Sequence, residues 1–217
     1  MSSTASIVLL QNDPLVGECL RRSIHAEAGL RVAGLACTLA QARTLLARAD
    51  ADLLVADLSV AGERLVELLS EHQVRGSRER PQVVAVAMSQ DDPQLLLALR
   101  VGAHGYFIHG SPVQALLGVI HQVLAGESPM SASIARRLKV HLPRPGGQPG
   151  SNHDAAQEPA LTAADYQLLD RVSQGYLSHE IARELQTSER SLGLRTRSLY
   201  GKLQLEFRGG AAPGQAG

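Results

Sequence analysis

The sequence predicts an α/β fold, a doubly wound sheet of five parallel strands, joined to a second and smaller all-α domain. Three observations carry this prediction. Short apolar runs alternate with helix-period segments over the first 142 residues. A stretch rich in proline and glycine follows them. After that stretch the hydrophobic pattern becomes entirely helical.

Five short apolar runs are expected to form the sheet, because strands that are buried on both faces appear as continuous hydrophobic segments. These runs are Ile7–Leu10, Arg31–Ala36, Leu53–Ala56, Val83–Ala87 and Gly105–Ile108. The helix-period segments between and after them are Pro14–His25, Leu39–Ala49, Gly62–Gln73, Pro93–Val101 and Pro112–Leu124. Five strand–helix units in this order indicate a flavodoxin-like fold, in which functional sites lie at the carboxyl ends of the strands.

The composition is that of a protein with an aliphatic core. Hydrophobic residues make up 44% of the 217 positions and aromatic residues only 3%. A formal net charge of zero excludes a uniformly basic surface but leaves room for a local basic patch. Cys19 and Cys37 are expected to be free thiols. The pattern contains neither a signal peptide nor a membrane span, so we expect a cytoplasmic protein without a membrane partner.

Composition also sets the expected domain boundaries. We assign residues 1–142 to the α/β domain, 143–159 to a flexible linker, 160–208 to the helical domain and 209–217 to a disordered tail. A linker of this kind spans roughly 20–25 Å, so the two domains are expected to move almost independently. The α/β domain ends in a trailing helix at Ser131–Val140, whose Arg136, Arg137 and Lys139 we interpret as a solvated helix end, with an anionic ligand or DNA phosphate as the alternative.

The helical domain has the pattern of a helix-turn-helix, in which two short helices are joined by a tight turn and the second is basic. Thr162 and Asp165 form a capping box that opens a first helix, and Gly175 ends it. Ser178 is expected to cap the next helix. A turn at residues 186–188 then leads into a third helix, and the leucines expected to face inward on it are Leu192, Leu199 and Leu203.

Specific residues of this domain resemble the LuxR-type helix-turn-helix: Gly175–Leu185, Ser188-Glu189 and Lys202-Leu203. With Asp57-Leu58, Gly62 and Ala98–Tyr106 in the front domain, nearly the whole chain up to Phe207 resembles a NarL/FixJ-type response regulator. The resemblance implies that the α/β domain is a receiver and that the helical domain binds double-stranded promoter DNA. The family's fourth helix, which commonly pairs subunits, is not recognisable in residues 206–217.

The third helix carries four basic residues and one acidic residue between Ser188 and Leu203. Arg190, Leu194 and Arg197 recur at helical spacing on the face opposite the leucines, and this face is expected to enter the major groove together with Ser191. The resemblance implies base reading by Leu194 and Arg197, and phosphate contacts by Arg190, Arg195 and Lys202. The alternative is a solvated basic face on a structural helix. Gly193 stands where the family usually has a lysine.

Asp57 matches the phospho-accepting aspartate of receivers, but its expected partners are missing. The family's carboxylate pair for Mg²⁺ is replaced by Gln11 and Asn12, with Asp13 one place further on. Ala87 replaces the hydroxyl that follows the fourth strand, and His109 replaces the lysine that follows the fifth. Tyr106, which matches an aromatic that family members rotate inward, is expected to be a packed surface ring.

These residues favour a DNA-binding transcription regulator that does not depend on phosphorylation. We expect its output to be set by homodimerisation through the receiver, by expression level, or by a protein or small-ligand effector. One alternative is a protein-interaction module that titrates another regulator and hardly binds DNA. A second is a conventional aspartyl-phosphate response regulator. The sequence shows no enzyme motif, no metal-ligand spacing and no cofactor motif, so we expect no catalysis, no metal and no cofactor.

Overall fold

The computed structural model describes residues 4–61, 68, 81–141 and 161–210, with the backbone alone for residues 206–210. Its sheet has five parallel strands in the order β2-β1-β3-β4-β5, which is the flavodoxin-like order. The prediction of a doubly wound α/β fold followed by helices is therefore confirmed. The strands are β1 Ala5–Leu10, β2 Leu30–Ala36, β3 Leu53–Asp57, β4 Gln82–Ala87 and β5 Gly105–Ile108.

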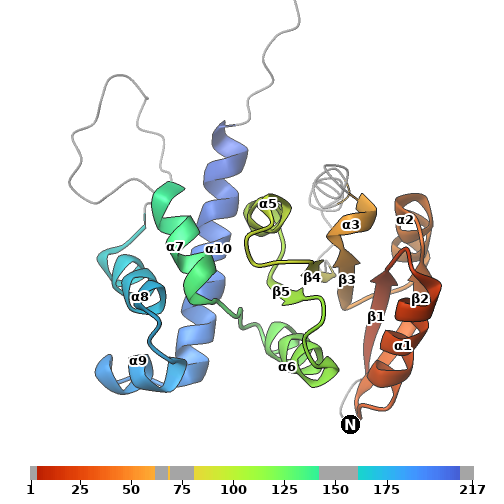
Figure 1. Ribbon diagram of the computed structural model, residues 1–217, viewed down its shortest axis with the longest axis horizontal. Helices are drawn as coiled ribbons and strands as arrows, with labels where there is room; N and C mark the ends of the chain where they lie inside the picture. Colours follow the sequence, from red (N-terminus) through yellow and green to blue (C-terminus); the bar gives the residue numbers. More distant parts are fainter. Residues whose placement is uncertain (1–3, 62–67, 69–80, 142–160, 211–217) are drawn as a thin grey trace, which may run out of the picture.

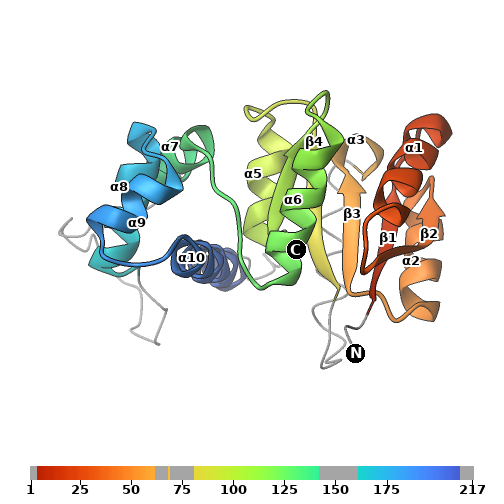
Figure 2. The same cartoon turned by 90° about the horizontal axis from the view of Figure 1, so that it is seen from below.

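Helices cover both faces of the sheet (Figures 1 and 2). Strand residues that alternate along each strand pack on one side against α1 Pro14–His25 and α6 Val113–Leu124. The other residues pack against α2 Leu39–Arg48, α3 Leu58–Ala61 and α5 Pro93–Val101. The helix expected at Gly62–Gln73 lies, apart from Leu68, outside the described residues.

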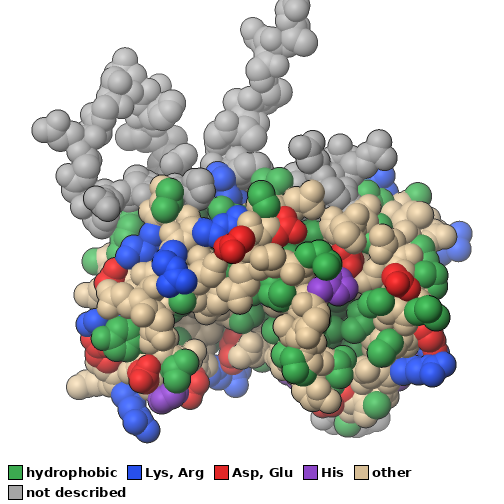
Figure 3. All heavy atoms as spheres, viewed as in Figure 1, with side chains coloured by type: hydrophobic (Ala, Val, Ile, Leu, Met, Phe, Trp, Pro, Cys, Tyr) green, Lys and Arg blue, Asp and Glu red, His purple; other side chains and the backbone are tan. Residues whose placement is uncertain are grey.

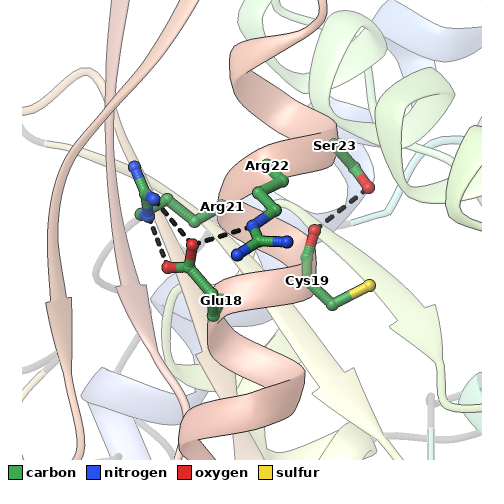
Figure 4. Close-up of polar contacts among 5 residues, drawn as sticks. All are labelled: Glu18, Cys19, Arg21, Arg22 and Ser23. Carbon is green, nitrogen blue, oxygen red and sulfur yellow. Dashed lines mark hydrogen bonds and ion pairs between the residues drawn. The ribbon is translucent and has the colours of Figure 1, made fainter.

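The first helix shows how local sequence fixes an element. Asp13 is the N-cap of α1, its carboxylate accepts from the backbone N–H groups of Leu15 and Val16, and Pro14 opens the helix. On the solvent side Glu18 accepts hydrogen bonds from both Arg21 and Arg22 (Figure 4). Those hydrogen bonds lower the pKa of the Glu18 carboxyl to about 2. The cluster is exposed, so its contribution to stability is small.

The remaining helices are α7 Ala132–His141, α8 Ala163–Gln174, α9 Ser178–Glu184 and α10 Glu189–Gly210. The predicted capping box of Thr162 and Asp165 is present, and Gly175 ends α8 with a left-handed φ of +93°. Ser178 is the first residue of α9 and not its cap. That prediction was wrong because Glu180 accepts from the backbone N–H of Leu177, which serves the same end of the helix.

The end of the chain also differs from expectation. A disordered tail was predicted from residue 209, but α10 continues through Gly210, and residues 211–217 lie outside the described part. The two consecutive glycines suggested a helix stop, yet the helix begun at Glu189 extends over them. The predicted linker at 143–159 also lies outside the described residues.

The α/β domain and the helical domain are packed together. The chain leaves α6, crosses to α7, and α7 lies along α8, while α10 lies against α5 (Figure 2). Buried side chains from both domains form one apolar cluster, in which Leu99 and Tyr106 of the first join Leu199 and Tyr200 of the second. The expectation of almost independent motion does not describe this arrangement, because it rested on linker length and not on the surfaces that pack. No helix within the described ranges is long and apolar enough to cross a membrane.

Candidate switch pocket and nucleic-acid interface

The residues predicted to form a degenerate switch pocket come together at the carboxyl ends of β1, β3, β4 and β5. Gln11 follows β1, Asp57 ends β3, Ala87 ends β4 and His109 follows β5. Asp57 and Gln11 are each only 3% exposed. The topology therefore places a carboxylate and an amide inside the protein, where each needs internal hydrogen-bond partners.

The Asp57 carboxylate receives those partners from three directions. Gln11 donates its Nε2 to Asp57 Oδ2 at 2.7 Å, and the Nε2 of His109 lies 2.7 Å from the same oxygen. The backbone N–H of Ser59 donates to Oδ1 at 2.8 Å. An ionised carboxylate can only accept, so His109 Nε2 carries the proton in this pair. Gln11, and not the neighbouring Asn12, occupies the position beside Asp57.

Burial and hydrogen bonding act on this carboxyl in opposite directions. Burial raises the pKa of Asp57, whereas hydrogen bonds from Ser59, His109 and Gln11 lower it, and the net pKa lies below the ordinary value. The charged form is therefore the stable form in the fold. Its negative charge is held by hydrogen-bond donors of the protein itself.

The residues of the pocket do not fit a magnesium ion. Gln11 uses its amide on Asp57 and on the backbone N–H of Asp13, and Asn12 is exposed. Asp13 uses its carboxylate as the cap of α1. A hard divalent cation needs several oxygen ligands with negative charge, and Asp57 is the only carboxylate among these positions that is turned into the pocket. Among the described residues, no group of three or more potential metal ligands is found.

Tyr106 was expected to be a packed surface ring, but the structure buries it, with 8% of the residue exposed. Its ring belongs to the same apolar cluster as Ala87, and its hydroxyl accepts from the backbone N–H of Ser131 at 2.8 Å. Burial raises the pKa of the Tyr106 hydroxyl. Ala87 leaves the ring no hydroxyl to meet, so the phenol reaches outward to the start of α7. This position could not be inferred without knowing where α7 packs.

The face of α10 that was predicted to read DNA lies next to the receiver. Arg197 donates from Nη1 to Gln82 Oε1 at 3.0 Å, and burial lowers its pKa. Leu194 is 45% exposed and borders Gly126. Arg190 is 72% exposed and forms a long ion pair, 4.0 Å, with Glu127. We call this docked position of α10 the closed arrangement.

The other predicted DNA residues occupy different environments. Arg195 is exposed, and Ser191 is partly exposed, with its backbone N–H donated to Ser188 Oγ at 3.1 Å. Lys202 is 18% exposed and forms an ion pair with Asp165 of the capping box. Lys202 therefore joins α10 to α8 in this structure, whereas Arg195, like Arg190, faces solvent.

Sequence reasoning missed the backbone contacts that hold α10 in place. The carbonyl of Gly193 accepts from the backbone N–H of Ser128 at 3.1 Å. Tyr200 donates its hydroxyl to the carbonyl of Pro129 at 2.9 Å, and Gln204 donates to the carbonyls of Leu99 and Ala103. A Cβ on Gly193 would lie 2.9 Å from Glu127 Cβ. The glycine at this position, where the family usually has a lysine, was the available signal.

The basic residues of α7 are not a solvated helix end. Arg137 donates to the carbonyls of Gln90 and Asp92 in the loop after β4. Arg136 and Lys139 face the other domain, where they contact Ser173, and Lys139 also pairs with Asp170 at 2.6 Å. Basic side chains gather over α7 on the face shown in Figure 3, with acidic ones beside them. The helix therefore ties the loop after β4 to α8.

The chain is similar to known regulators along almost its whole length. It is 26% identical to the nitrate/nitrite response regulator protein NarL of Escherichia coli (strain K12) over 208 residues, 96% of this chain and 93% of that protein. It is 24% identical to NarP of the same strain over 204 residues, 93% of this chain and 90% of that protein. No protein-family model matches the chain.

Solved structures agree with this similarity. A two-component response regulator of the LuxR family from Aurantimonas sp. SI85-9A1 is 30% identical, with a TM-score of 0.55, over 64% of this chain and 98% of that chain. RcsB from Salmonella enterica serovar Typhimurium, bound to the promoter P1flhDC in the presence of phosphomimetic BeF3-, has a TM-score of 0.54 at 18% identity and covers 93% of both chains. The second likeness shows the shared fold.

Proposed function

The chain belongs to the NarL/FixJ-type response regulators, and from that premise we propose that it regulates transcription by binding promoter DNA without using phosphorylation of Asp57 as its switch. Regulators of this class are transcription factors and not enzymes, in agreement with the expectation from sequence. The observation that carries the second half of the proposal is the double occupation of Asp57 Oδ2 by Gln11 and His109.

Phosphoryl transfer to an aspartate needs one free carboxylate oxygen as nucleophile and a cation to neutralise the incoming charge. Asp57 Oδ2 already accepts two hydrogen bonds at 2.7 Å, and Oδ1 accepts one at 2.8 Å. The Asp57 side chain is 4% exposed, so a phosphodonor has no direct path to either oxygen. Gln11 and His109 thus take the places that the metal and the phosphoryl group would fill, and the receiver stays in one state.

This half of the proposal is tested by incubation with acetyl phosphate and Mg²⁺, followed by mass measurement of the intact protein. We expect no mass gain in the wild type. The matched variant Gln11→Asp/Asn12→Asp/His109→Lys restores a carboxylate pair and a lysine and is expected to gain one phosphoryl group. A stoichiometric gain in the wild type that disappears in Asp57→Asn would overturn the proposal.

DNA binding is supported by the helix-turn-helix of α9 and α10 and by the exposed arginines Arg190 and Arg195. In the closed arrangement Arg197 contacts the receiver, so full engagement of the major groove requires α10 to leave Gln82 and residues 126–129. We propose Arg190, Ser191, Leu194, Arg195 and Arg197 as the DNA surface. Lys202 is left out of it because it is paired with Asp165.

Arg195 offers the cleanest test because its side chain is exposed on α10. In mobility-shift titrations over a salt series, Arg195→Ala is expected to reduce the salt slope by about one. Arg22→Ala on α1 removes an equally exposed arginine outside the helical domain and is expected to leave the slope unchanged. If the wild type is not retained by DNA even at low salt, the rival function, titration of another regulator through protein contacts, takes its place.

We further propose that the protein acts in the cytoplasm as a homodimer joined through its receiver, with a protein or small-ligand effector in control. The helix α5 is covered by α10 in the closed arrangement, which leaves the solvent side of α6 for the pairing surface. Release of α10 would uncover α5 as well, so dimerisation and DNA binding would be coupled. Sedimentation of the wild type with and without operator DNA tests this coupling.

A further inference from the structure

A cavity of about 310 Å³ lies between the two domains. Its walls come from the end of α6 and the segment that follows, from α8 and α9, and from the first two turns of α10. In Figure 3 the molecule is hollowed between α6 and the helices α9 and α10. The volume is at the lower end of the range of small-molecule sites, roughly 300–1,000 Å³.

Two polar groups beside this cavity lack close hydrogen-bond partners in the protein. Ser128 is 3% exposed, and its hydroxyl has no hydrogen-bond partner. The Glu127 side chain is only 18% exposed, and its ion pair with Arg190 spans 4.0 Å, which is too long for a hydrogen bond. A largely buried carboxylate in this condition is costly unless another group meets it.

The position of Glu127 is a consequence of Gly193. A side chain at 193 would lie 2.9 Å from both the Cβ and Oε2 of Glu127. Because Gly193 has no side chain, Glu127 packs directly on α10, and the backbone N–H of Ser128 reaches the Gly193 carbonyl. Gly193 thus allows the loop after α6 to approach α10 closely and places the Glu127 carboxylate at the cavity wall.

The lining defines the chemistry of an occupant. Glu127 and Glu189 supply two negative charges, whereas Arg190 supplies one positive charge and points largely to solvent at 72% exposure. The start of α10 does not call for an anion, because Ser188 already accepts from the N–H of Ser191 and Glu189 lies in the first turn. The apolar part of the wall consists of Leu168, Val172 and Ile181.

We propose that this cavity binds a small organic cation with a short apolar body, whose charged head meets the Glu127 carboxylate and whose body packs on α8 and α9. The ligand touches both domains, so it binds the closed arrangement in preference to an open one. At a concentration of a hundred times its Kd it raises the closed-to-open ratio about 100-fold. The inhibition of DNA binding that follows rests on the proposed function, whereas the site itself does not.

The binding test uses n-pentylamine, protonated at neutral pH, as the probe on the full chain, with pentan-1-ol and pentanoate as probes of matched length. Backbone amide NMR shifts are followed during titration. We expect saturable shifts at Ser128 and Gly193 with the amine, weaker binding of the alcohol and none of pentanoate. Absence of saturation with the amine, or tighter binding of pentanoate, would overturn the proposal.

Variants separate the site from general effects. Glu127→Gln keeps the shape of the side chain and is expected to weaken amine binding at least about tenfold. Ile181→Phe fills the cavity from α9 and is expected to abolish binding, with circular dichroism as a check of folding. Glu18→Gln removes an exposed acid on α1 and is expected to change nothing. Unchanged amine binding in Glu127→Gln contradicts the proposal even if Ile181→Phe fails to fold.

The consequence for DNA is measured separately, by mobility shift at saturating amine. A wild type that binds DNA is expected to lose retention when the amine is added. If amine binding is normal but the wild type binds no DNA under any condition, the proposed function fails and the site stands. If DNA binding is normal and the amine leaves it unchanged, the preference of the ligand for the closed arrangement is disproved.

Discussion

Two polar regions of the receiver differ in how completely the protein satisfies them. At the carboxyl ends of the strands, the Asp57 carboxylate has a donor on each side and is 3% exposed. At the opposite edge of the sheet, beside α10, the Ser128 hydroxyl has no partner and Glu127 has only a distant one. In the first region the carboxylate already has its hydrogen bonds, whereas in the second the Glu127 carboxylate can still gain contacts.

The difference indicates where control resides. A receiver is switched when a new charge at its phosphorylation site finds partners that the resting state lacks. Here Asp57 already has donors, and under the proposed function the pocket contributes stability and not a second state. Few hydrogen bonds join α10 to residues 126–129 among the described residues, and a cavity lies beside this interface. A ligand, partner or substitution at that contact can therefore shift the equilibrium between closed and open arrangements.

Removal of the Asp57 carboxylate should have the largest effect on stability and none on DNA. In Asp57→Ala the donors of Gln11, His109 and Ser59 lose their acceptor, and a loss of about 3 kcal/mol in the free energy of unfolding is expected. DNA retention per folded molecule should be unchanged. Urea unfolding measures the first and mobility shift the second. Asp50→Ala, at an exposed position, is the control and should stay within about 0.5 kcal/mol of the wild type.

The interface beside α10 should be sensitive to pH in a higher range than the pocket. His104 Nδ1 accepts from the backbone N–H of Val83, and burial, with a contribution from the charge of Arg197, lowers the pKa of the imidazole from 6.5 to about 3. Below pH 6.5 His104 therefore binds a proton in the unfolded state but not in the folded state, and the free energy of unfolding falls as pH falls. Between pH 6.5 and 5.0 the loss is about 2 kcal/mol.

Urea unfolding at several pH values tests this window. His104→Gln keeps an acceptor for the backbone N–H of Val83 and does not titrate. The slope of its unfolding free energy against pH should therefore be smaller than that of the wild type by about one proton, or about 1.4 kcal/mol per pH unit. An identical slope in the two proteins would contradict the assignment. Asp57, whose pKa is lowered from 3.8, contributes stability that is present above that value and lost only as pH falls through the lowered pKa, so the two regions are separable on one pH axis.

Two glycines on the same helix provide a matched pair for the contact itself. In Gly193→Ala the new Cβ meets Glu127 Cβ at 2.9 Å, whereas a Cβ at Gly201 meets nothing within 4 Å. Both substitutions strengthen α10 by about 1 kcal/mol as a helix. Only Gly193→Ala should weaken the closed arrangement, and we expect DNA affinity to rise about tenfold, which corresponds to about 1.4 kcal/mol. Equal DNA affinities of the two variants would show that Gly193 does not control docking.

Much of the fold was predictable from the sequence because it depends on local pattern. The five apolar runs became the five strands, and Thr162, Asp165 and Gly175 acted at the ends of α8 as predicted. The end of α10 was mispredicted because two consecutive glycines weaken a helix without always ending it. The union of both domains in one core lay beyond sequence pattern, since it depends on which surfaces meet.

The sequence predicted which residues form the pocket but not which of them contact one another. The ends of β1, β3, β4 and β5 identified Gln11, Asp57, Ala87 and His109, because carboxyl ends of parallel strands share one edge. That Gln11 and not Asn12 turns to Asp57 depends on the direction of each side chain where β1 ends. The docking of Arg197 on Gln82 was not predictable, because these residues lie 115 positions apart and belong to different domains.

The smallest expected effect comes from the receiver side of that docking contact. Gln82→Ala removes the acceptor of Arg197 without touching α10, so Arg197 becomes freer for DNA while every predicted DNA-contacting residue is kept. The side chains are partly exposed, and the lost hydrogen bond is worth about 1 kcal/mol, so DNA affinity should rise about fivefold in mobility-shift titrations. Gln94→Ala, on α5, is the control. In Gln82→Ala/Arg197→Ala the gain should vanish, because the released arginine is the residue that produces it. A gain that survives in the double variant would mean that Gln82 restrains α10 by some route other than Arg197.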